Sequence, residues 1–229
     1  MQSVREWGRV GRERARPRAN WEHWRRAGKV CAQTRPVCAR GGQWAMDKRE
    51  SFGYAAGSGA GAVPGLRVAH GYDLHRLDAL RPRGNGRALI VGGVVLEHDR
   101  GPVAHSDGDV LYHAVVDALM GAIAGPDIGQ MFPDNLPEND GRDSADFVRE
   151  AARRLKESGW EIVNMDCTVI LEKPRLSPVK ERIRENLSRL LGVEGARINV
   201  KGKSHEQVDA VGEGRAIESH VVVLLWKAR

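Results

Sequence analysis

The body of the chain is organised around residues 105–124, HSDGDVLYHAVVDALMGAIA. Apolar residues recur in this stretch with the period of a helix, at positions 110, 111, 114, 115, 118, 119 and 122. Ser106 is a suitable N-cap, and Asp109 stands three residues later as in a variant capping box. Gly125 and Pro126 end the pattern. The stretch therefore predicts a helix over residues 106–124.

Segments on both sides of this helix alternate between strand and helix patterns. Residues 162–171 place apolar side chains at 163, 165, 167, 169 and 171, which indicates a half-buried strand with Cys167 as a small core residue. Further strands are expected over residues 66–72, 88–96, 197–201 and 217–226, and further helices over residues 144–158 and 178–191. This order predicts an α+β fold in which helices cover one face of a single sheet.

The composition is that of a soluble globular protein, with 41% hydrophobic and 29% charged residues. No stretch approaches the roughly 18 apolar residues that a membrane-spanning helix needs. Cys31, Cys38 and Cys167 form an odd set, which argues against a disulfide scaffold, and no apolar signal segment follows the N-terminus. We therefore expect a cytoplasmic protein without membrane contact, and a plastid location is less favoured.

Residues 1–64 differ from the rest of the chain in charge. They hold 13 Lys and Arg against 5 Asp and Glu, whereas residues 65–229 hold 23 against 25. Nucleic-acid binding is therefore conceivable only for this segment, and we do not expect it to be the main function. We expect an unstructured basic extension that ends in a Gly- and Ala-rich linker, or upstream sequence before a true start at Met46. A transit peptide is the weaker alternative, because serine is sparse and five acidic residues are present. Residues 65–229 are expected to form one domain.

Asp73, His75 and His113 are candidate metal ligands. Asp73 and His75 are two positions apart, so on an extended strand their side chains point to the same side. His113 lies in the predicted helix, with Asp109 and Asp117 four positions away in either direction. Two imidazoles and one carboxylate leave a fourth position open, as in catalytic zinc sites. The alternative is a simple turn and a core histidine, because spacing alone does not bring the strand and the helix together.

Two further polar segments could bind phosphate or polyol groups. Residues 201–206, KGKSHE, combine two lysines, a hydroxyl and a glycine, which suit phosphate oxygens, with Glu206, which suits Mg²⁺. The sequences DIG at residues 127–129 and FPD at 132–134 form a loop after the first helix. Ordinary turn chemistry and a solvent-exposed strand end remain the alternatives for these segments.

In combination, these motifs resemble one family, the 2-C-methyl-D-erythritol 2,4-cyclodiphosphate synthases. The resemblance rests on HGYDLH at 70–75, GGV at 92–94, HSDGDVLYHA at 105–114, DAL at 117–119, DIG at 127–129, FPD at 132–134, DS at 143–144, EKP at 172–174 and KGKSHE at 201–206. These motifs occur in order between about Leu66 and Trp226, so the resemblance covers the whole body and does not account for residues 1–64.

The resemblance implies a phosphorus–oxygen lyase of the non-mevalonate pathway of isoprenoid precursor synthesis. Members of the family cyclise 4-diphosphocytidyl-2-C-methyl-D-erythritol 2-phosphate by attack of the 2-phosphate on the β-phosphorus, with release of CMP. By similarity, Asp73, His75 and His113 hold Zn²⁺, and Glu206 holds Mg²⁺ or Mn²⁺ at the diphosphate. A metal-dependent nucleotide hydrolase with the same ligands is the alternative activity.

The resemblance also implies roles for the remaining site residues. His105 and Ser204 are expected to brace the transferring phosphoryl group as catalytic residues. The expected substrate contacts are these two together with Asp73, His75, Ser106, Asp127, Ile128, Gly129, Phe132, Pro133, Asp134, Pro174, Arg175, Leu176, Lys203, His205 and Glu206. The family is trimeric, with sheets facing inward and each site between two subunits, so we expect a homotrimer.

Overall fold

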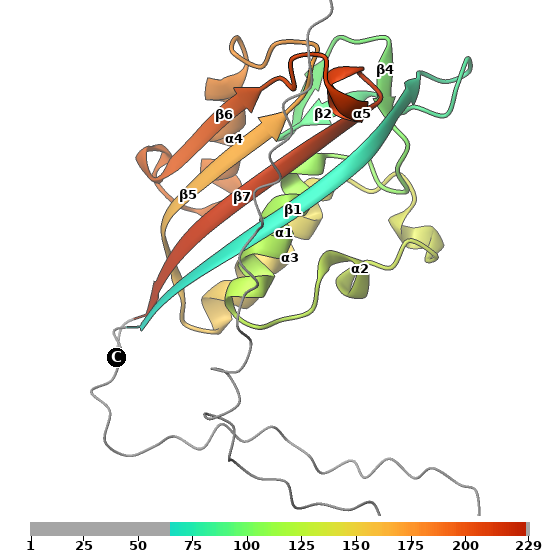
Figure 1. Cartoon of the computed structure of the whole chain (residues 1–229). Helices are drawn as coiled ribbons and strands as arrows, with labels where there is room; N and C mark the ends of the chain where they lie inside the picture. The colour runs from blue at the N-terminus through green and yellow to red at the C-terminus, as the bar shows by residue number, and fades with distance from the viewer. Residues whose placement is uncertain (1–64, 228–229) are drawn as a thin grey trace, which may run out of the picture. The chain divides into compact units, whose positions relative to one another are not determined.

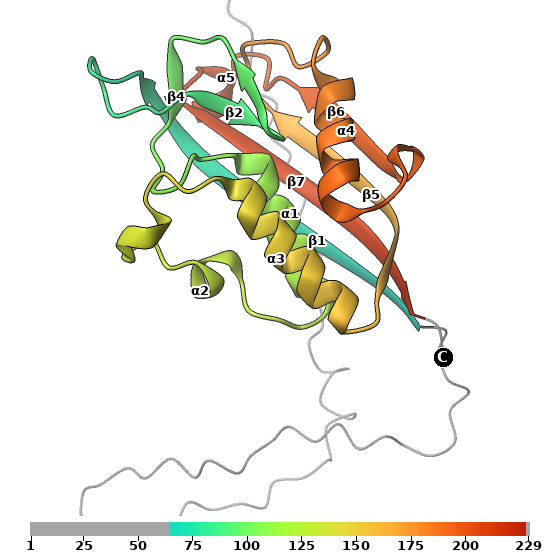
Figure 2. The same cartoon turned by 180° about the vertical axis from the view of Figure 1, so that it is seen from behind.

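The computed structural model describes residues 65–227 and has one main sheet with helices on one face (Figure 1 and Figure 2). Across the sheet the strands are β4 (Arg100–Pro102), β1 (Gly65–Ala79), β7 (Ala216–Lys227), β5 (Glu161–Ile170) and β6 (Ile198–Lys203). The helix α1 (Val110–Ala122) packs against β1 and β7, α4 (Lys180–Leu191) packs against β6, and α3 (Ser144–Glu157) packs against both helices. The predicted α+β fold with one covered sheet face is confirmed. The predicted basic extension, its linker and the start at Met46 lie outside the described residues.

Strand β1 directs the candidate metal ligands toward the helices. It runs antiparallel to β7, with Asp73 opposite Ser219 and His75 opposite Ile217. Both of these β7 residues are almost completely buried. Because side chains alternate between the two faces of a strand, Asp73 and His75 point into the layer between sheet and helices. The strand continues to Ala79, well beyond the predicted end at residue 72.

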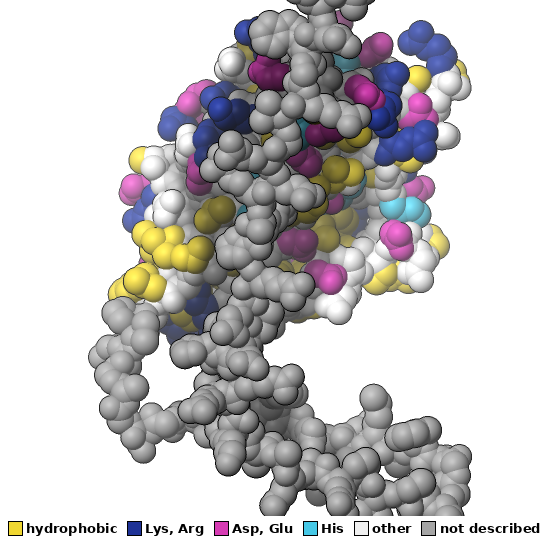
Figure 3. Space-filling view, viewed as in Figure 1, with side chains coloured by type: hydrophobic (Ala, Val, Ile, Leu, Met, Phe, Trp, Pro, Cys, Tyr) yellow, Lys and Arg dark blue, Asp and Glu magenta, His cyan; other side chains and the backbone are white. Residues whose placement is uncertain are grey.

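The opposite face of the sheet has no layer of long helices within residues 65–227 (Figure 1). Its exposed apolar side chains include Leu66, Val68, Tyr72 and Leu74 on β1 and Val222 on β7. Figure 3 shows hydrophobic side chains on this face, interspersed with acidic ones. A row of exposed apolar residues on one sheet face is typical of a surface that another chain covers.

Residues 88–96 form a hairpin and not the single predicted strand. The two short strands are β2 (Leu89–Val91) and β3 (Val94–Leu96), which pair antiparallel. Gly92 and Gly93 connect them with φ angles of 57° and 71°. These positive values match a two-residue turn that glycine adopts without steric cost.

Helix α1 begins after Asp109, so the prediction of Ser106 as its N-cap was wrong. The Asp109 carboxylate accepts hydrogen bonds from the backbone N–H groups of Leu111 and Tyr112. It also accepts the N–H groups of Gly92 and Gly93, at 3.0 and 2.7 Å. One fully buried carboxylate therefore starts the helix and fixes the β2–β3 turn against it.

The other predicted elements are present with shifted ends. Strand β5 has an irregularity between Ile162 and Asn164, which buries Ile162 and exposes Val163, so Val163 is not part of the predicted buried row. Cys167 is completely buried, as predicted. Short elements missed by the sequence analysis are β4, α2 (Ile128–Met131), α5 (Asp209–Gly212) and two 3₁₀ turns at Pro137–Asn139 and Gly195–Arg197. Among the described helices none is both long and apolar enough to cross a membrane.

Candidate active site

Three potential metal ligands converge where β1 passes under α1. His113 Nδ1 lies 2.9 Å from Asp73 Oδ2 and 3.1 Å from His75 Nε2. His75 Nε2 lies 3.2 Å from the same carboxylate oxygen. The structure thus brings together the three residues that sequence spacing could not connect, and they form a group able to hold a metal ion.

The geometry of this triad fits a divalent metal ion. Ligands about 2.1 Å from a tetrahedral ion are about 3.4 Å apart, so the three donor atoms are within about 0.5 Å of the required spacing. The set contains two imidazole nitrogens and one carboxylate oxygen, which leaves a coordination position open. Small outward movements of side chains would complete the match.

The protonation states of Asp73 and His75 suit a metal ion at neutral pH. Burial lowers the pKa of His75 and so favours the neutral imidazole that a metal requires. Burial alone would raise the pKa of Asp73, but the hydrogen bond with His113 and the two nearby imidazoles leave that pKa below its ordinary value. The site therefore presents a carboxylate and a neutral ligand before any metal arrives.

Beside the triad lies a cavity of about 290 Å³. Its lining residues are His75, Val103, Ala104, His105, Ser106, His113, Ile128, Gly129, Phe132, Asp134, Asn139 and Phe147. The cavity therefore gathers His105, Ser106 and most of the predicted loop residues around the metal ligands. Pro133 and Asp127 are not part of its lining. The Asp127 carboxylate instead caps α2 by accepting the N–H of Gln130, which is the turn chemistry weighed as the alternative.

Other residues of the site carried no recognisable sequence signal. Val103, Ala104, Asn139 and Phe147 line the cavity, and Phe147 stacks on Phe132 with ring centres 4.1 Å apart. Phe147 comes from α3, and its place in the site depends on how α3 packs against α1. No local pattern predicts such a contact.

A second group of predicted site residues follows β5 and β6, level with the triad along the strands but across the sheet from β1. Leu176 packs close to Gly202, and Leu171 N–H donates to the Lys203 carbonyl at 2.9 Å. Ser204 donates a hydrogen bond to Glu206 at 2.9 Å. This group comprises Pro174, Arg175, Leu176, Lys203, Ser204, His205 and Glu206, and none of them lines the cavity beside the triad.

The loop of this second group reaches the open face of the sheet. His205 Nε2 lies 3.5 Å from Glu218 Oε1 on β7, and Glu218 in turn accepts a hydrogen bond from the Tyr72 hydroxyl at 3.2 Å. Glu206 and Gln207 have φ angles of 51° and 63°, which non-glycine residues seldom adopt. Such backbone strain is typical of functional loops.

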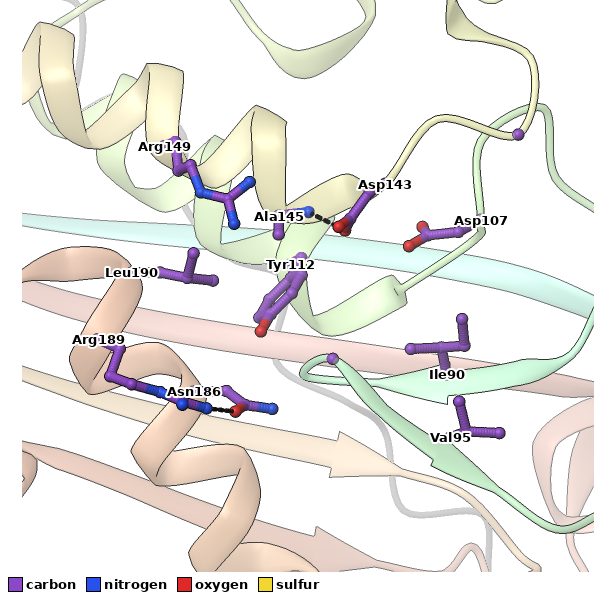
Figure 4. A pocket seen from close by; sticks show the side chains of 12 residues that line it. Ile90, Val95, Asp107, Tyr112, Asp143, Ala145, Arg149, Asn186, Arg189 and Leu190 are labelled. Carbon is purple, nitrogen blue, oxygen red and sulfur yellow. Dashed lines mark hydrogen bonds between the residues drawn. The ribbon is translucent and has the colours of Figure 1, made fainter.

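Two cavities of about 700 and 730 Å³ lie on the outer side, and another of about 380 Å³ lies beside Glu172 and Gly212; all are larger and include no residue of the triad. Figure 4 shows the first, between the β2–β3 hairpin and the helices α3 and α4, with Tyr112, Arg149 and Arg189 around it. The candidate active site is therefore identified by its metal-ligand residues and not by the volume of its cavity. The fold and the triad define an α+β protein with a candidate divalent-metal site beside a small cavity of mixed polar and apolar lining.

The comparisons with known proteins agree with this description. The YgbB family model matches residues 66–226. A chloroplastic 2-C-methyl-D-erythritol 2,4-cyclodiphosphate synthase of Arabidopsis thaliana is 53% identical over 162 residues, covering 71% of this chain and 68% of the relative. The synthase of Rhodopirellula baltica is 46% identical over 160 residues, covering 70% of this chain and 93% of the relative. The solved structure of IspF from Plasmodium falciparum in complex with CDP is 34% identical, with a TM-score of 0.63, covering 73% of this chain and all of that one.

The chain belongs to the YgbB family. The family resemblance predicted from the motifs is therefore confirmed, and the relatives that carry the synthase name are enzymes.

Proposed function

We propose that the chain cyclises 4-diphosphocytidyl-2-C-methyl-D-erythritol 2-phosphate to 2-C-methyl-D-erythritol 2,4-cyclodiphosphate, with release of CMP, in isoprenoid precursor synthesis. The observation that carries the proposal is the triad of Asp73, His75 and His113, whose donor atoms lie 2.9 to 3.2 Å apart beside a cavity that His105, Ser106 and Asp134 also line. Family membership and the names of the relatives support this activity.

The reaction needs positioning and charge stabilisation and not a protein nucleophile, because the attacking group is the substrate's own 2-phosphate. Asp73, His75 and His113 would hold Zn²⁺, which would supply Lewis-acid polarisation of a phosphoryl oxygen. His105 and Ser106 line the cavity next to the triad, where they are placed to hold phosphoryl oxygens. In this proposal Ile128, Gly129, Phe132 and Asp134, which line the same cavity, contact the erythritol part.

The second group serves the cytidine diphosphate end in this proposal. Glu206 would hold Mg²⁺ or Mn²⁺, which would offset the negative charge of the diphosphate. Lys203 and Arg175 add positive charge, and Ser204 adds a hydroxyl at the diphosphate. Pro174 and Leu176 form the support for the nucleoside beside the end of β6. The complex of a relative with CDP is consistent with a cytidine nucleotide ligand.

We further propose that the chain works as a homotrimer in which each site combines two chains. The loop that carries Glu206 contacts Glu218 on the open face of the sheet, whereas Asp73 and His75 point to the helix-covered face. Within one chain the sheet therefore lies between the triad and this loop. The cavity of about 290 Å³ is also smaller than most small-molecule sites, which measure about 300–1,000 Å³.

The exposed apolar row on the open face is the proposed contact between subunits. Val68→Asp should dissociate the trimer, because it adds a charge to a side chain that is 70% exposed on this face. Val95→Asp is the matched control, since Val95 is 67% exposed but lies on the β2–β3 hairpin. Sedimentation velocity measures both variants. A trimeric Val68→Asp protein would contradict this interface.

Two proposals concern the chain as a whole. Residues 65–229 form the synthase domain, and residues 1–64 are an extension that the reaction does not need. We keep the cytoplasm as the proposed location. The plastid is the alternative, which chloroplastic names among the relatives support.

The test is a ³¹P NMR assay of the full chain with the diphosphocytidyl substrate, Zn²⁺ and Mg²⁺. We expect a cyclic diphosphate and an equimolar amount of CMP. CMP accompanied only by linear phosphates would identify a hydrolase that uses the same ligands. His113→Ala should lose bound zinc and nearly all turnover while remaining trimeric, and retained turnover would refute the assignment of the triad.

A further inference from the structure

We propose that Ser144 and Asp107 position His113 as a metal ligand by fixing the hydrogen atom on its Nε2 atom. The inference rests on the metal site proposed above. It adds two residues to that site which come from the start of α3 and from the loop before α1.

Hydrogen bonds connect His113 to Ser144 and Ser144 to Asp107, on the side away from the triad. Ser144 Oγ lies 2.9 Å from His113 Nε2, on the ring edge opposite the Nδ1 atom that faces Asp73. The Ser144 hydroxyl donates a hydrogen bond to Asp107 Oδ1, and the Ser144 backbone N–H donates to Asp107 Oδ2 at 3.1 Å. Ser144 is completely buried, so water does not compete for these bonds.

The Asp107 carboxylate determines which group donates in each of these hydrogen bonds. An ionised carboxylate only accepts hydrogen bonds, so the Ser144 hydroxyl hydrogen is committed to Asp107. The Ser144 oxygen then has only lone pairs to offer His113, so Nε2 must be the N–H donor. In a neutral imidazole the other nitrogen, Nδ1, then has the free lone pair that a metal needs.

A second hydroxyl near the ring does not fix this direction. Ser106 Oγ lies 3.2 Å from His113 Nε2 and accepts the backbone N–H of Gly108 at 3.2 Å. Its hydroxyl hydrogen has no carboxylate partner among the described contacts, so this group can either donate to Nε2 or accept from it. Ser144 differs because Asp107 orients it.

Asp107 is itself held in place. Its Oδ1 also accepts the backbone N–H of Asp109 at 3.1 Å, next to the buried cap of α1. Figure 4 shows Asp107 at the border of the outer cavity, beside the start of α3. The carboxylate therefore belongs to rigid structure and not to a mobile loop tip, which suits a group that orients a ligand. Partners of this kind behind a metal-bound histidine change metal affinity by about 10–100-fold when removed.

The experiment measures the zinc dissociation constant of the full chain by competition with a chromophoric chelator. Ser144→Ala should raise this constant about 10–100-fold, and Ser144→Thr, which keeps the hydroxyl, should bind zinc within about threefold of the wild type. Asp107→Asn should raise it as well, because an amide cannot accept from both the N–H and the hydroxyl of Ser144. Ser188→Ala is the control, since the Ser188 hydroxyl donates to the Val193 carbonyl at the far end of α4.

Urea unfolding of the metal-free variants shows whether a loss of zinc affinity comes from a loss of stability. If Ser144→Ala does not fold, Asp107→Asn alone provides the test. Because Asp107 acts through Ser144, the double variant should bind zinc no more weakly than Ser144→Ala. A zinc affinity of Ser144→Ala within threefold of the wild type, or effects that multiply in the double variant, would overturn the inference. A wild-type chain that binds no zinc would overturn the metal site along with it.

Discussion

Gly71 sets the distance between the strand and the helix that carry the metal ligands. A Cβ atom added at Gly71 would lie 1.9 Å from the Ala114 carbonyl oxygen and 2.5 Å from the Ala118 nitrogen. Both atoms belong to the backbone of α1, so no side chain can rotate out of the way. Gly71→Ala must therefore move α1 away from β1.

The size of that movement follows from the contact. Ordinary van der Waals contact begins at 3.4 Å, so α1 has to retreat by about 1.5 Å from its 1.9 Å contact. His113 precedes Ala114 and moves with it. Its 2.9 Å distance to Asp73 then becomes about 4.4 Å, or about 1 Å beyond the edge of a zinc tetrahedron. Overpacking of a core costs about 1–3 kcal/mol, and contact between two backbones favours the upper end.

The assay combines urea unfolding with a zinc titration. We expect Gly71→Ala to lose about 3 kcal/mol of its free energy of unfolding and to bind zinc more than about 100-fold less tightly, because one of three ligands moves out of reach. Gly121→Ala is the control, because Gly121 lies in α1 and a Cβ added there would meet only Ala69 of β1, at 4.0 Å. That variant should gain about 0.5–1 kcal/mol from helix propensity. If Gly71→Ala binds zinc like the wild type, close approach of β1 and α1 is not what assembles the triad.

Four further predictions concern stability and metal binding. Burial raises the pKa of Asp109 to about 6, so the free energy of unfolding of the wild type should fall as pH rises from 4 to 7. Asp109→Asn lacks this titration and should not show the same fall. Parallel pH profiles of the two proteins in urea unfolding would contradict this. Burial raises the pKa of Cys167 to about 12, so iodoacetamide at pH 8 should modify it in urea but not in the native chain, as peptide mapping would show. Zinc at 100 times its dissociation constant should add about 2.7 kcal/mol to the free energy of unfolding, and the same zinc should leave His113→Ala unchanged. Glu206→Gln should raise the Mg²⁺ concentration needed for turnover without changing zinc content, and loss of zinc would disprove the separate roles.

Sequence patterns predicted the long elements because their periodicity is local. Residues 144–158 and 178–191 carry a helical period that needs no tertiary information, and both helices form there. The hairpin over residues 88–96 was missed although Gly92 and Gly93 mark its turn. The start of α1 was misplaced for a different reason. Ser106 and Asp109 are both good caps, and a tertiary contact with the β2–β3 turn decides for Asp109.

Sequence patterns predicted only those parts of the candidate site that lie within a single strand or helix. The alternation of a strand places Asp73 and His75 on one side, and this survives in the structure. The approach of His113 depends on the absence of a side chain at Gly71, and that role appears only once the packing is known. The contact between Ser144 and Asp107 joins residues 37 positions apart in the sequence, and no spacing rule connects them.

The two groups of site residues also differ in rigidity, and this difference fits their proposed tasks. The triad is built on a strand that pairs with β7 over residues 65–76 and on a helix whose residues are nearly all buried, so its geometry is set by folding. Ser204 and Glu206 lie in an exposed loop, and Glu206 has a left-handed backbone. A single carboxylate in such a loop is a poor magnesium site by itself, because Mg²⁺ depends on phosphate oxygens and water for its remaining ligands. The triad can therefore bind its metal before substrate arrives, whereas the loop completes its metal site only when the diphosphate is present. In the proposed trimer, the substrate would therefore meet the triad of one chain first, and Glu206 of the neighbouring chain would complete the second metal site.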